Sequence, residues 1–179
     1  MQKKNDWYGK PLKIGVASDH GGYEKKNELI GKLSDKGLKA VDLGPEEYSE
    51  IDDYPSFANN LCRKLVKGEI TCGILLCRTG IGMTIAANRF PGIRAAYADN
   101  REAVTKSRTH NASNILVAGC DEFSTDGIFE LVEEWLNTPF SGDERHERRI
   151  AELDVDTYDE IAAVRGQDPD VADLLDREA

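Results

Sequence analysis

Residues 72–89 read C-G-I-L-L-C-R-T-G-I-G-M-T-I-A-A-N-R. The first six form a continuous apolar run, which is typical of a strand covered on both faces of a sheet. Gly80 and Gly82 predict a turn, and a helix is expected to begin within residues 84–89. A buried strand that passes through a glycine turn into a helix is the repeating unit of parallel α/β sheets.

The same alternation continues on both sides of this stretch. Further apolar runs predict strands at residues 12–18, 39–43, 93–98 and 114–118. Apolar residues at helical spacing predict helices at residues 23–36, 57–65, 101–109 and 124–137. Strands that alternate with helices predict an α/β fold of three layers, with a doubly wound, mostly parallel, five-stranded, Rossmann-like sheet. In such folds ligands bind beyond the carboxyl ends of the strands.

Charged residues are distributed unevenly along the chain. The 179 residues carry 33 acidic and 23 basic side chains, and 10 of the acidic but only 2 of the basic ones lie in residues 152–179. We therefore expect a loose N-terminal arm (1–11), one domain (12–153) and an acidic C-terminal extension (154–179), whose interspersed apolar residues suggest helices docked on a partner subunit. The acidic balance argues against nucleic-acid binding. The lack of a long apolar run argues against a membrane segment or secretion signal, so a cytoplasmic protein is expected.

The cysteines and histidines follow no recognisable framework. Their spacings match neither a disulfide scaffold nor a metal-binding motif, and the residues are Cys62, Cys72, Cys77, Cys120, His20, His110 and His146. Free thiols in a reducing compartment are the simplest interpretation, and no metal or cofactor is predicted.

Cys77 is the first candidate for chemistry because it ends the apolar strand at the glycine turn. Backbone N–H groups at such a turn suit an anion or a developing oxyanion. We expect this positive end to lower the pKa of the thiol from about 8.5, which would make it a usable base. The alternative is that Cys77 is only the last core residue of its strand.

Two polar pairs stand at other element ends. Asp19 and His20 follow the first strand and could contact a ligand, or Asp19 could simply cap a helix. His110 and Asn111 end a helix before the fifth strand, where a histidine can also complement the helix dipole.

A basic cluster occupies residues 145–149. Arg145 and Arg149 are four residues apart, so on a helix they could grip one phosphate or carboxylate together. The alternative is a solvated helix face on which they pair with Glu144 and Glu147.

Six segments together resemble the ribose-5-phosphate isomerase B family, which includes the galactose-6-phosphate isomerase subunits. They are S-D-H-G-G (18–22), D-Y-P (53–55), G-I-L-L-C-R-T-G-I-G-M-T-I-A-A-N (73–88), G-I-R-A (92–95), S-R-T-H-N (107–111) and R-H-E-R-R (145–149). They follow the family order and extend over residues 12–153.

The resemblance implies metal-free aldose–ketose isomerisation through an enediolate, on a small sugar phosphate. It implies that Cys77 is the proton-transfer base and that His110 opens the sugar ring. It assigns the enediolate and substrate contacts to Thr79, Gly80, Gly82, Asp19, His20, Tyr54, Asn111, Arg145 and Arg149. It further implies a homodimer or a dimer of dimers whose sites combine both subunits.

Three positions depart from the family pattern. Arg78 replaces a glycine, Asp121 replaces a phosphate-binding arginine, and Met83 stands where some members carry a glutamate base. Arg78 could favour the thiolate or bind an anionic group, whereas Asp121 would repel phosphate. Two alternatives follow: an isomerase of an unphosphorylated or carboxylated sugar, in which Arg78 and Asp121 shape the distal pocket, and a non-catalytic sugar or nucleotide binder.

Overall fold

Five parallel strands form the central sheet of the computed structural model, which describes residues 6, 7 and 10–153. The strands are β3 (Ile14–Ser18), β4 (Ala40–Asp42), β5 (Cys72–Cys77), β6 (Ala95–Tyr97) and β7 (Ile115–Gly119). Their order is β4-β3-β5-β7-β6, and every neighbouring pair is parallel. The predicted α/β fold with a five-stranded doubly wound sheet is confirmed.

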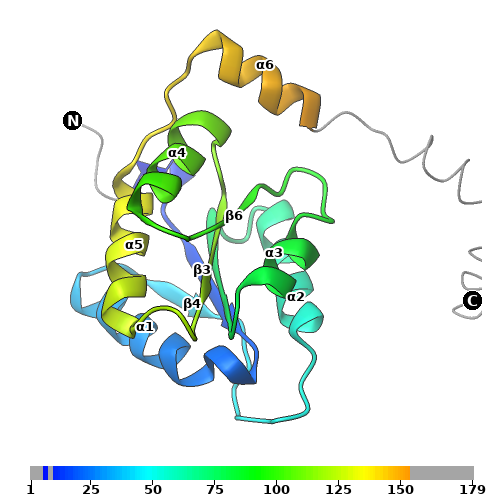
Figure 1. Ribbon diagram of the computed structural model, residues 1–179, viewed down its shortest axis with the longest axis vertical. Helices are drawn as coiled ribbons and strands as arrows, with labels where there is room; N and C mark the ends of the chain where they lie inside the picture. The colour runs from blue at the N-terminus through cyan, green and yellow to red at the C-terminus, as the bar shows by residue number, and fades with distance from the viewer. Residues whose placement is uncertain (1–5, 8–9, 154–179) are drawn as a thin grey trace, which may run out of the picture.

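Helices cover both faces of this sheet (Figure 1). One face carries α1 (Tyr23–Asp35), α4 (Arg101–Asn111) and α5 (Thr125–Asn137), and the other carries α2 (Tyr54–Val66) and α3 (Ile81–Ala87). A short 3-10 turn, η1 (His20–Gly22), precedes α1, and α6 (Glu144–Leu153) follows α5. Among the described residues, no helix is long and apolar enough to cross a membrane.

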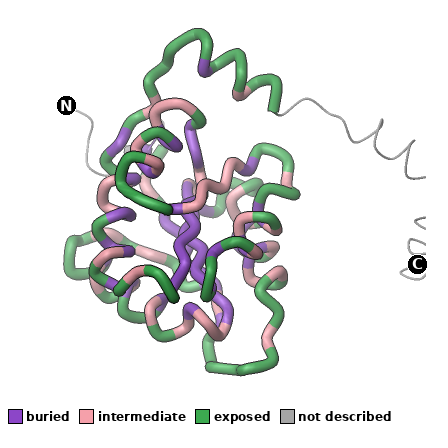
Figure 2. The backbone as a smooth tube through the Cα atoms, in the orientation of Figure 1, coloured by how far each residue is buried: buried purple, intermediate pink, exposed green. Residues whose placement is uncertain are grey.

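The core consists of two apolar clusters that lie on opposite faces of the sheet. The central strands between them are buried (Figure 2). Successive residues of a strand point to opposite faces, so β5 contributes to both clusters. Ile74 and Leu76 belong to the cluster under α1 and α5, whereas Leu75 and Cys77 belong to the one under α2 and α3. The Cys77 side chain therefore faces α3.

The N-terminal segment is not a loose arm where the structure describes it. Strands β1 (Asp6–Trp7) and β2 (Lys10–Pro11) pair antiparallel, and the Trp7 side chain is buried. Its ring lies 4.9 Å from that of Trp135 and 4.1 Å from the Arg108 guanidinium. The expectation was wrong because three lysines dominate the composition of this segment, whereas one tryptophan determines where it packs.

Element boundaries shift by a few residues from those predicted. One difference is at α3, which begins at Ile81 because Gly80, at φ 74°, turns the chain directly into the helix. The predicted docked helices of residues 154–179 lie outside the described residues.

Candidate active site

The loop after β5 wraps backbone N–H groups around the Cys77 sulfur. Gly80 donates its N–H to Sγ at 3.0 Å, and the left-handed conformation of Gly80 makes this return possible. An added Cβ at Gly80 would lie 2.5 Å from a ring carbon of Tyr97, so this position also needs glycine for space. The loop and the sulfur lie at the carboxyl end of β5, between β3 and β7. The strand order reverses at this point, because the chain goes from β3 outward to β4 and then returns to β5 on the other side of β3.

The Cys77 thiol is largely buried, and this burial raises its pKa above the ordinary value. Backbone N–H groups of Met83, Gly80 and Thr79 act in the opposite direction, and the nearby Asp19 carboxylate adds to the increase. The expected lowering of the pKa is therefore wrong, because desolvation outweighs the hydrogen bonds to sulfur. The donors stabilise a thiolate once one forms.

Asp19 and His20 lie at the same edge, after β3. Asp19 is buried, its Oδ1 accepts the Gly22 N–H at 3.2 Å, and burial raises its pKa. Asp19 is thus the cap of η1 and also a neighbour of Cys77. His20 Nδ1 lies 2.6 Å from Asp52 Oδ1, and this hydrogen bond raises the pKa of His20.

Arg78 and Asp121, which the sequence presented as separate departures, form an ion pair. Arg78 Nε donates to Asp121 Oδ2 at 3.1 Å, and the Asp121 N–H donates to the Arg78 carbonyl at 2.9 Å. Lys25 fixes the loop that carries Asp121 by donating to the carbonyls of Cys120 and Phe123. Arg78 is therefore held at the edge of the site.

Tyr54, Gly82 and Thr79 complete the group near Cys77. An added Cβ at Gly82 would lie 2.8 Å from the Tyr54 ring, so this ring packs on the first turn of α3. Thr79 is exposed, and its hydroxyl oxygen accepts the Ile81 N–H at 3.4 Å.

His110, the residue predicted to open the sugar ring, does not lie beside Cys77 within one chain. Strand β6 ends at the carboxyl edge, and α4 then runs back along the sheet for 11 residues, about 16 Å. His110 and Asn111 are the last residues of α4, so they lie near the amino ends of the strands. Figure 1 shows α6 beyond this same end, opposite η1. Within one chain, therefore, the structure does not bring His110 and Cys77 together.

Arg145 and Arg149 also lie at this second location, on α6. Both are exposed, and Arg145 forms an ion pair with Asp143 at 3.8 Å. The buried His146 between them stacks on His110, which attaches α6 to α4.

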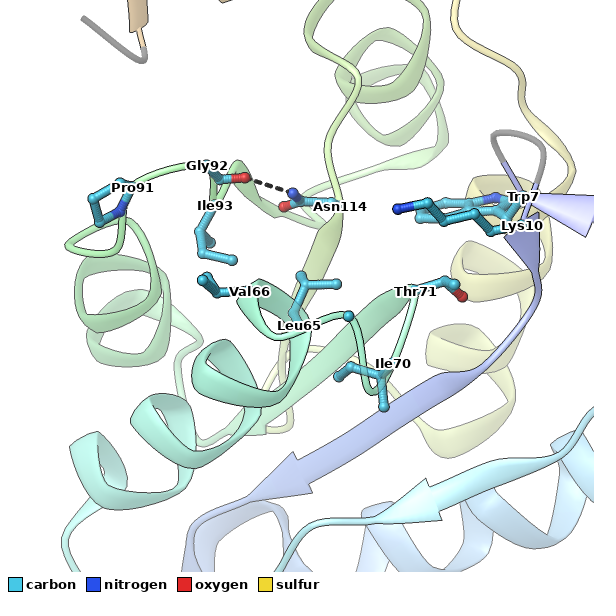
Figure 3. A pocket seen from close by; sticks show the side chains of 11 residues that line it. Trp7, Lys10, Leu65, Val66, Ile70, Thr71, Pro91, Gly92, Ile93 and Asn114 are labelled. Carbon is cyan, nitrogen blue, oxygen red and sulfur yellow. Dashed lines mark hydrogen bonds between the residues drawn. The ribbon is translucent and has the colours of Figure 1, made fainter. Parts of the chain in front are cut away.

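A cavity of about 350 Å³ opens at the amino edge (Figure 3). Trp7, Lys10, Ile70, Ile93 and Asn114 contribute to its lining. It contains none of the predicted site residues. In the described part of the chain no three His, Cys, Asp or Glu side chains are arranged to hold a metal ion.

The sequence profile of the ribose/galactose isomerase family matches residues 14–153. The chain belongs to this family. Ribose-5-phosphate isomerase B of Escherichia coli K12 is 36% identical over 138 residues, which are 77% of this chain and 91% of that one.

Solved structures agree with this membership. A ribose 5-phosphate isomerase from Thermotoga maritima is 41% identical with a TM-score of 0.76, over 80% of this chain and 97% of that one. Ribose-5-phosphate isomerase B from Mycoplasma genitalium, solved with bound ribulose-5-phosphate, is 33% identical with a TM-score of 0.76, over 83% and 97%. By class, then, this ribose/galactose isomerase family member is an aldose–ketose isomerase.

Sequence reasoning missed three residues at the carboxyl edge of this isomerase. Asp52 holds His20, and its Oδ2 is buried without a hydrogen-bond partner among the described residues. The Tyr97 hydroxyl donates to Glu122 at 2.7 Å, and burial followed by the Glu122 carboxylate raises the pKa of Tyr97 to about 12. Asp52 directly precedes the D-Y-P segment and Glu122 follows Asp121, but their neighbours come from distant elements.

Proposed function

We propose that this isomerase interconverts ribose 5-phosphate and ribulose 5-phosphate, with Cys77 as the base. The observation that carries the proposal is the Cys77 sulfur, which accepts the Gly80 N–H at 3.0 Å at the carboxyl edge of the sheet. A base there meets N–H donors already aimed at developing negative charge. The ribose-5-phosphate isomerases to which the chain is similar match 77–83% of its length.

The chemistry balances within the substrate. The Cys77 thiolate removes the proton from carbon-2 of the open-chain aldose, and the released electron pair forms the carbon-1–carbon-2 double bond. The carbonyl oxygen on carbon-1 takes the negative charge, which the N–H groups of the 79–83 loop stabilise. Return of the proton to carbon-1, with transfer of a proton from oxygen-2 to oxygen-1, gives the ketose and regenerates the base.

We further propose that a second copy of the chain completes each site. His110 and Asn111 lie at the amino edge together with Arg145 and Arg149 on α6, so a single chain separates them from Cys77. A two-fold dimer would place the amino-edge group of one copy against the carboxyl-edge group of the other. Such an arrangement gives two equivalent shared sites.

Apolar side chains exposed near the Cys77 loop support this assembly. Ile81 and Ile85 are each 61% exposed on one face of α3, and Ile51 before α2 is 92% exposed. Large aliphatic side chains with this much exposure favour contact with another protein surface. Contact there would bring a partner chain directly beside the loop that follows β5.

Exchange of substrate hydrogen with deuterated solvent tests the proposed chemistry. The wild-type protein should incorporate deuterium at carbon-1 of ribulose 5-phosphate and at carbon-2 of ribose 5-phosphate, but not into free ribose. Cys77→Ala should abolish this exchange. The matched control is Cys62→Ala, which removes a buried thiol of α2 that contacts the Ala87 carbonyl and should retain the exchange. Equal exchange by Cys77→Ala would remove Cys77 from the mechanism.

A further inference from the structure

Two pairs, each of a nitrogen base and a carboxylate, lie at the carboxyl edge of the sheet. His20 is hydrogen-bonded to Asp52 and Arg78 to Asp121, and the four residues come from four separate segments. From the sequence alone, neither Asp52 nor Asp121 is expected to orient another side chain. Each pair therefore places a side chain that can carry a positive charge at the edge of the sheet where Cys77 lies.

Backbone hydrogen bonds determine the position of the Arg78–Asp121 pair. Beyond β5 and β7, the Cys120 N–H donates to the Cys77 carbonyl at 2.8 Å and the Asp121 N–H to the Arg78 carbonyl at 2.9 Å. These two bonds join the residues that follow β5 to the residues that follow β7, and they set side chains 78 and 121 next to each other. Main-chain contacts between the two loops therefore hold the backbones of both residues of the pair.

The stem of Arg78 crosses over Gly21, the residue that follows His20. A Cβ added at Gly21 would lie only 2.2 Å from Arg78 Cγ, so Arg78 occupies the space that a side chain at position 21 would need. The charge of Arg78 acts to lower the pKa of His20, whereas the stronger effect of the Asp52 hydrogen bond raises it. Two groups that can both be positive are thus kept close together.

Most donors of Arg78 remain available. Only Nε is engaged by a side chain, and the two terminal nitrogens have no partner among the described residues. The side chain is 68% exposed. A guanidinium held by one carboxylate through Nε presents its remaining N–H groups in the planar arrangement that matches two oxygens of a phosphate.

We propose that Arg78 and His20 together bind the phosphate group of the substrate, and that Asp121 and Asp52 are positioning residues for these two ligands. The inference rests on the proposed function, because it names what holds the sugar phosphate in that same site. Asp121 alone would repel phosphate, but in an ion pair its charge is offset while its grip orients the guanidinium. The Asp52 hydrogen bond favours the imidazolium form of His20.

Inhibition by inorganic phosphate tests the role of Arg78. Arg78→Gln should raise both the Ki of inorganic phosphate and the KM for ribose 5-phosphate at least tenfold, while kcat changes less than threefold. The matched control is Arg63→Gln, which alters an exposed arginine on α2 and should change neither constant. An unchanged Ki in a folded Arg78→Gln variant would overturn the proposal.

A double-mutant cycle tests Asp121 as a positioning residue. Asp121→Asn should raise the Ki of phosphate three- to tenfold in the wild-type background and have no effect in the Arg78→Gln background. Asp126→Asn, which breaks an exposed ion pair with Lys32, is the control and should have no effect in either background. An equal effect of Asp121→Asn in both backgrounds would show that it does not act through Arg78.

The Asp52–His20 pair has its own readout. Asp52→Asn removes the hydrogen bond that favours the protonated form of His20, so the pKa of His20 should fall. Phosphate inhibition should then begin to weaken at a lower pH than in the wild-type protein. An unchanged pH profile of Ki would remove Asp52 from the proposal.

Failure of the proposed function can be separated from failure of this inference. If the wild-type protein exchanges no hydrogen of any sugar phosphate, the proposed function is wrong. Calorimetric titration of inorganic phosphate into the wild-type and Arg78→Gln proteins then still decides whether Arg78 binds the anion.

Discussion

The imidazole rings of His110 and His146 stack face to face, with centroids 4.4 Å apart and planes within 11° of parallel. The contact joins the end of α4 to the first turns of α6, and the His146 side chain is 5% exposed. His146 Nε2 is buried without a hydrogen-bond partner among the described residues. This stack attaches the helix that carries Arg145 and Arg149 to the helix that carries His110.

Acid should loosen that attachment. Burial lowers the pKa of His146, helped by the charges of His110, Arg145 and Arg149 and opposed by Asp143. Because the pKa is lower in the folded chain, the stabilisation is fully present above about pH 6.5 and is lost as the pH falls through the folded value. Hydrogen exchange should therefore show weaker protection of α6 amides at pH 5 than at pH 8, after correction for intrinsic rates.

The control for that experiment is His146→Phe, which keeps an aromatic ring on His110 but cannot be protonated. Its α6 protection should depend less on pH than that of the wild-type protein. Equal pH dependence in both proteins would contradict a role for His146.

Catalysis should accelerate in alkali. Because burial raises the pKa of Cys77, only a small fraction of the thiol is ionised at pH 7, and this fraction increases tenfold per pH unit below the pKa. We expect log kcat to rise with a slope near one between about pH 7 and pH 9. A kcat that is flat over this range would show that the thiolate is not the limiting species.

Gly80 should not tolerate a side chain. Its positive φ and its contact with the Tyr97 ring predict that Gly80→Ala costs about 2 kcal/mol of unfolding free energy and reduces kcat at least 100-fold. Gly37→Ala is the matched control, since Gly37 has φ 75° but open space around it. That variant should lose about 1 kcal/mol and keep full activity, as urea unfolding and initial rates would show.

Mixed dimers should reveal the shared site. Neither Cys77→Ala nor His110→Asn should be active alone, but co-refolding the two should restore about a quarter of wild-type activity, because half of the dimers are mixed and each has one intact site. If both residues acted within one chain, the mixture would stay inactive. Size-exclusion chromatography of each variant controls for loss of assembly.

Trp7 should matter for stability but not for chemistry. Trp7→Ala removes a buried ring that contacts Trp135 and Arg108, so we expect a loss of roughly 3 kcal/mol. Trp7→Phe, which keeps an aromatic ring at this position, should lose less than half of that amount. A change in kcat for either folded variant would contradict a purely structural role.

Periodicity was sufficient to predict the sheet and its helices, because continuous apolar runs and helical spacing are local signals. Short motifs located the loop after β5 and the turn after β3 for the same reason. The Arg78–Asp121 pair depends on which strands are neighbours, and the burial of Cys77 depends on α3 packing over it. Such effects arise only when distant segments meet, so residue-by-residue reasoning missed the ion pair and gave the wrong direction for the thiol pKa.

The four buried cysteines have a consequence for oxidative damage. All four are free, and burial raises the pKa of each, to about 12 for Cys62 and Cys120. Peroxides attack the thiolate and not the neutral thiol. The cysteines of the resting protein therefore offer peroxide few thiolates at neutral pH, although the proposed base is one of them.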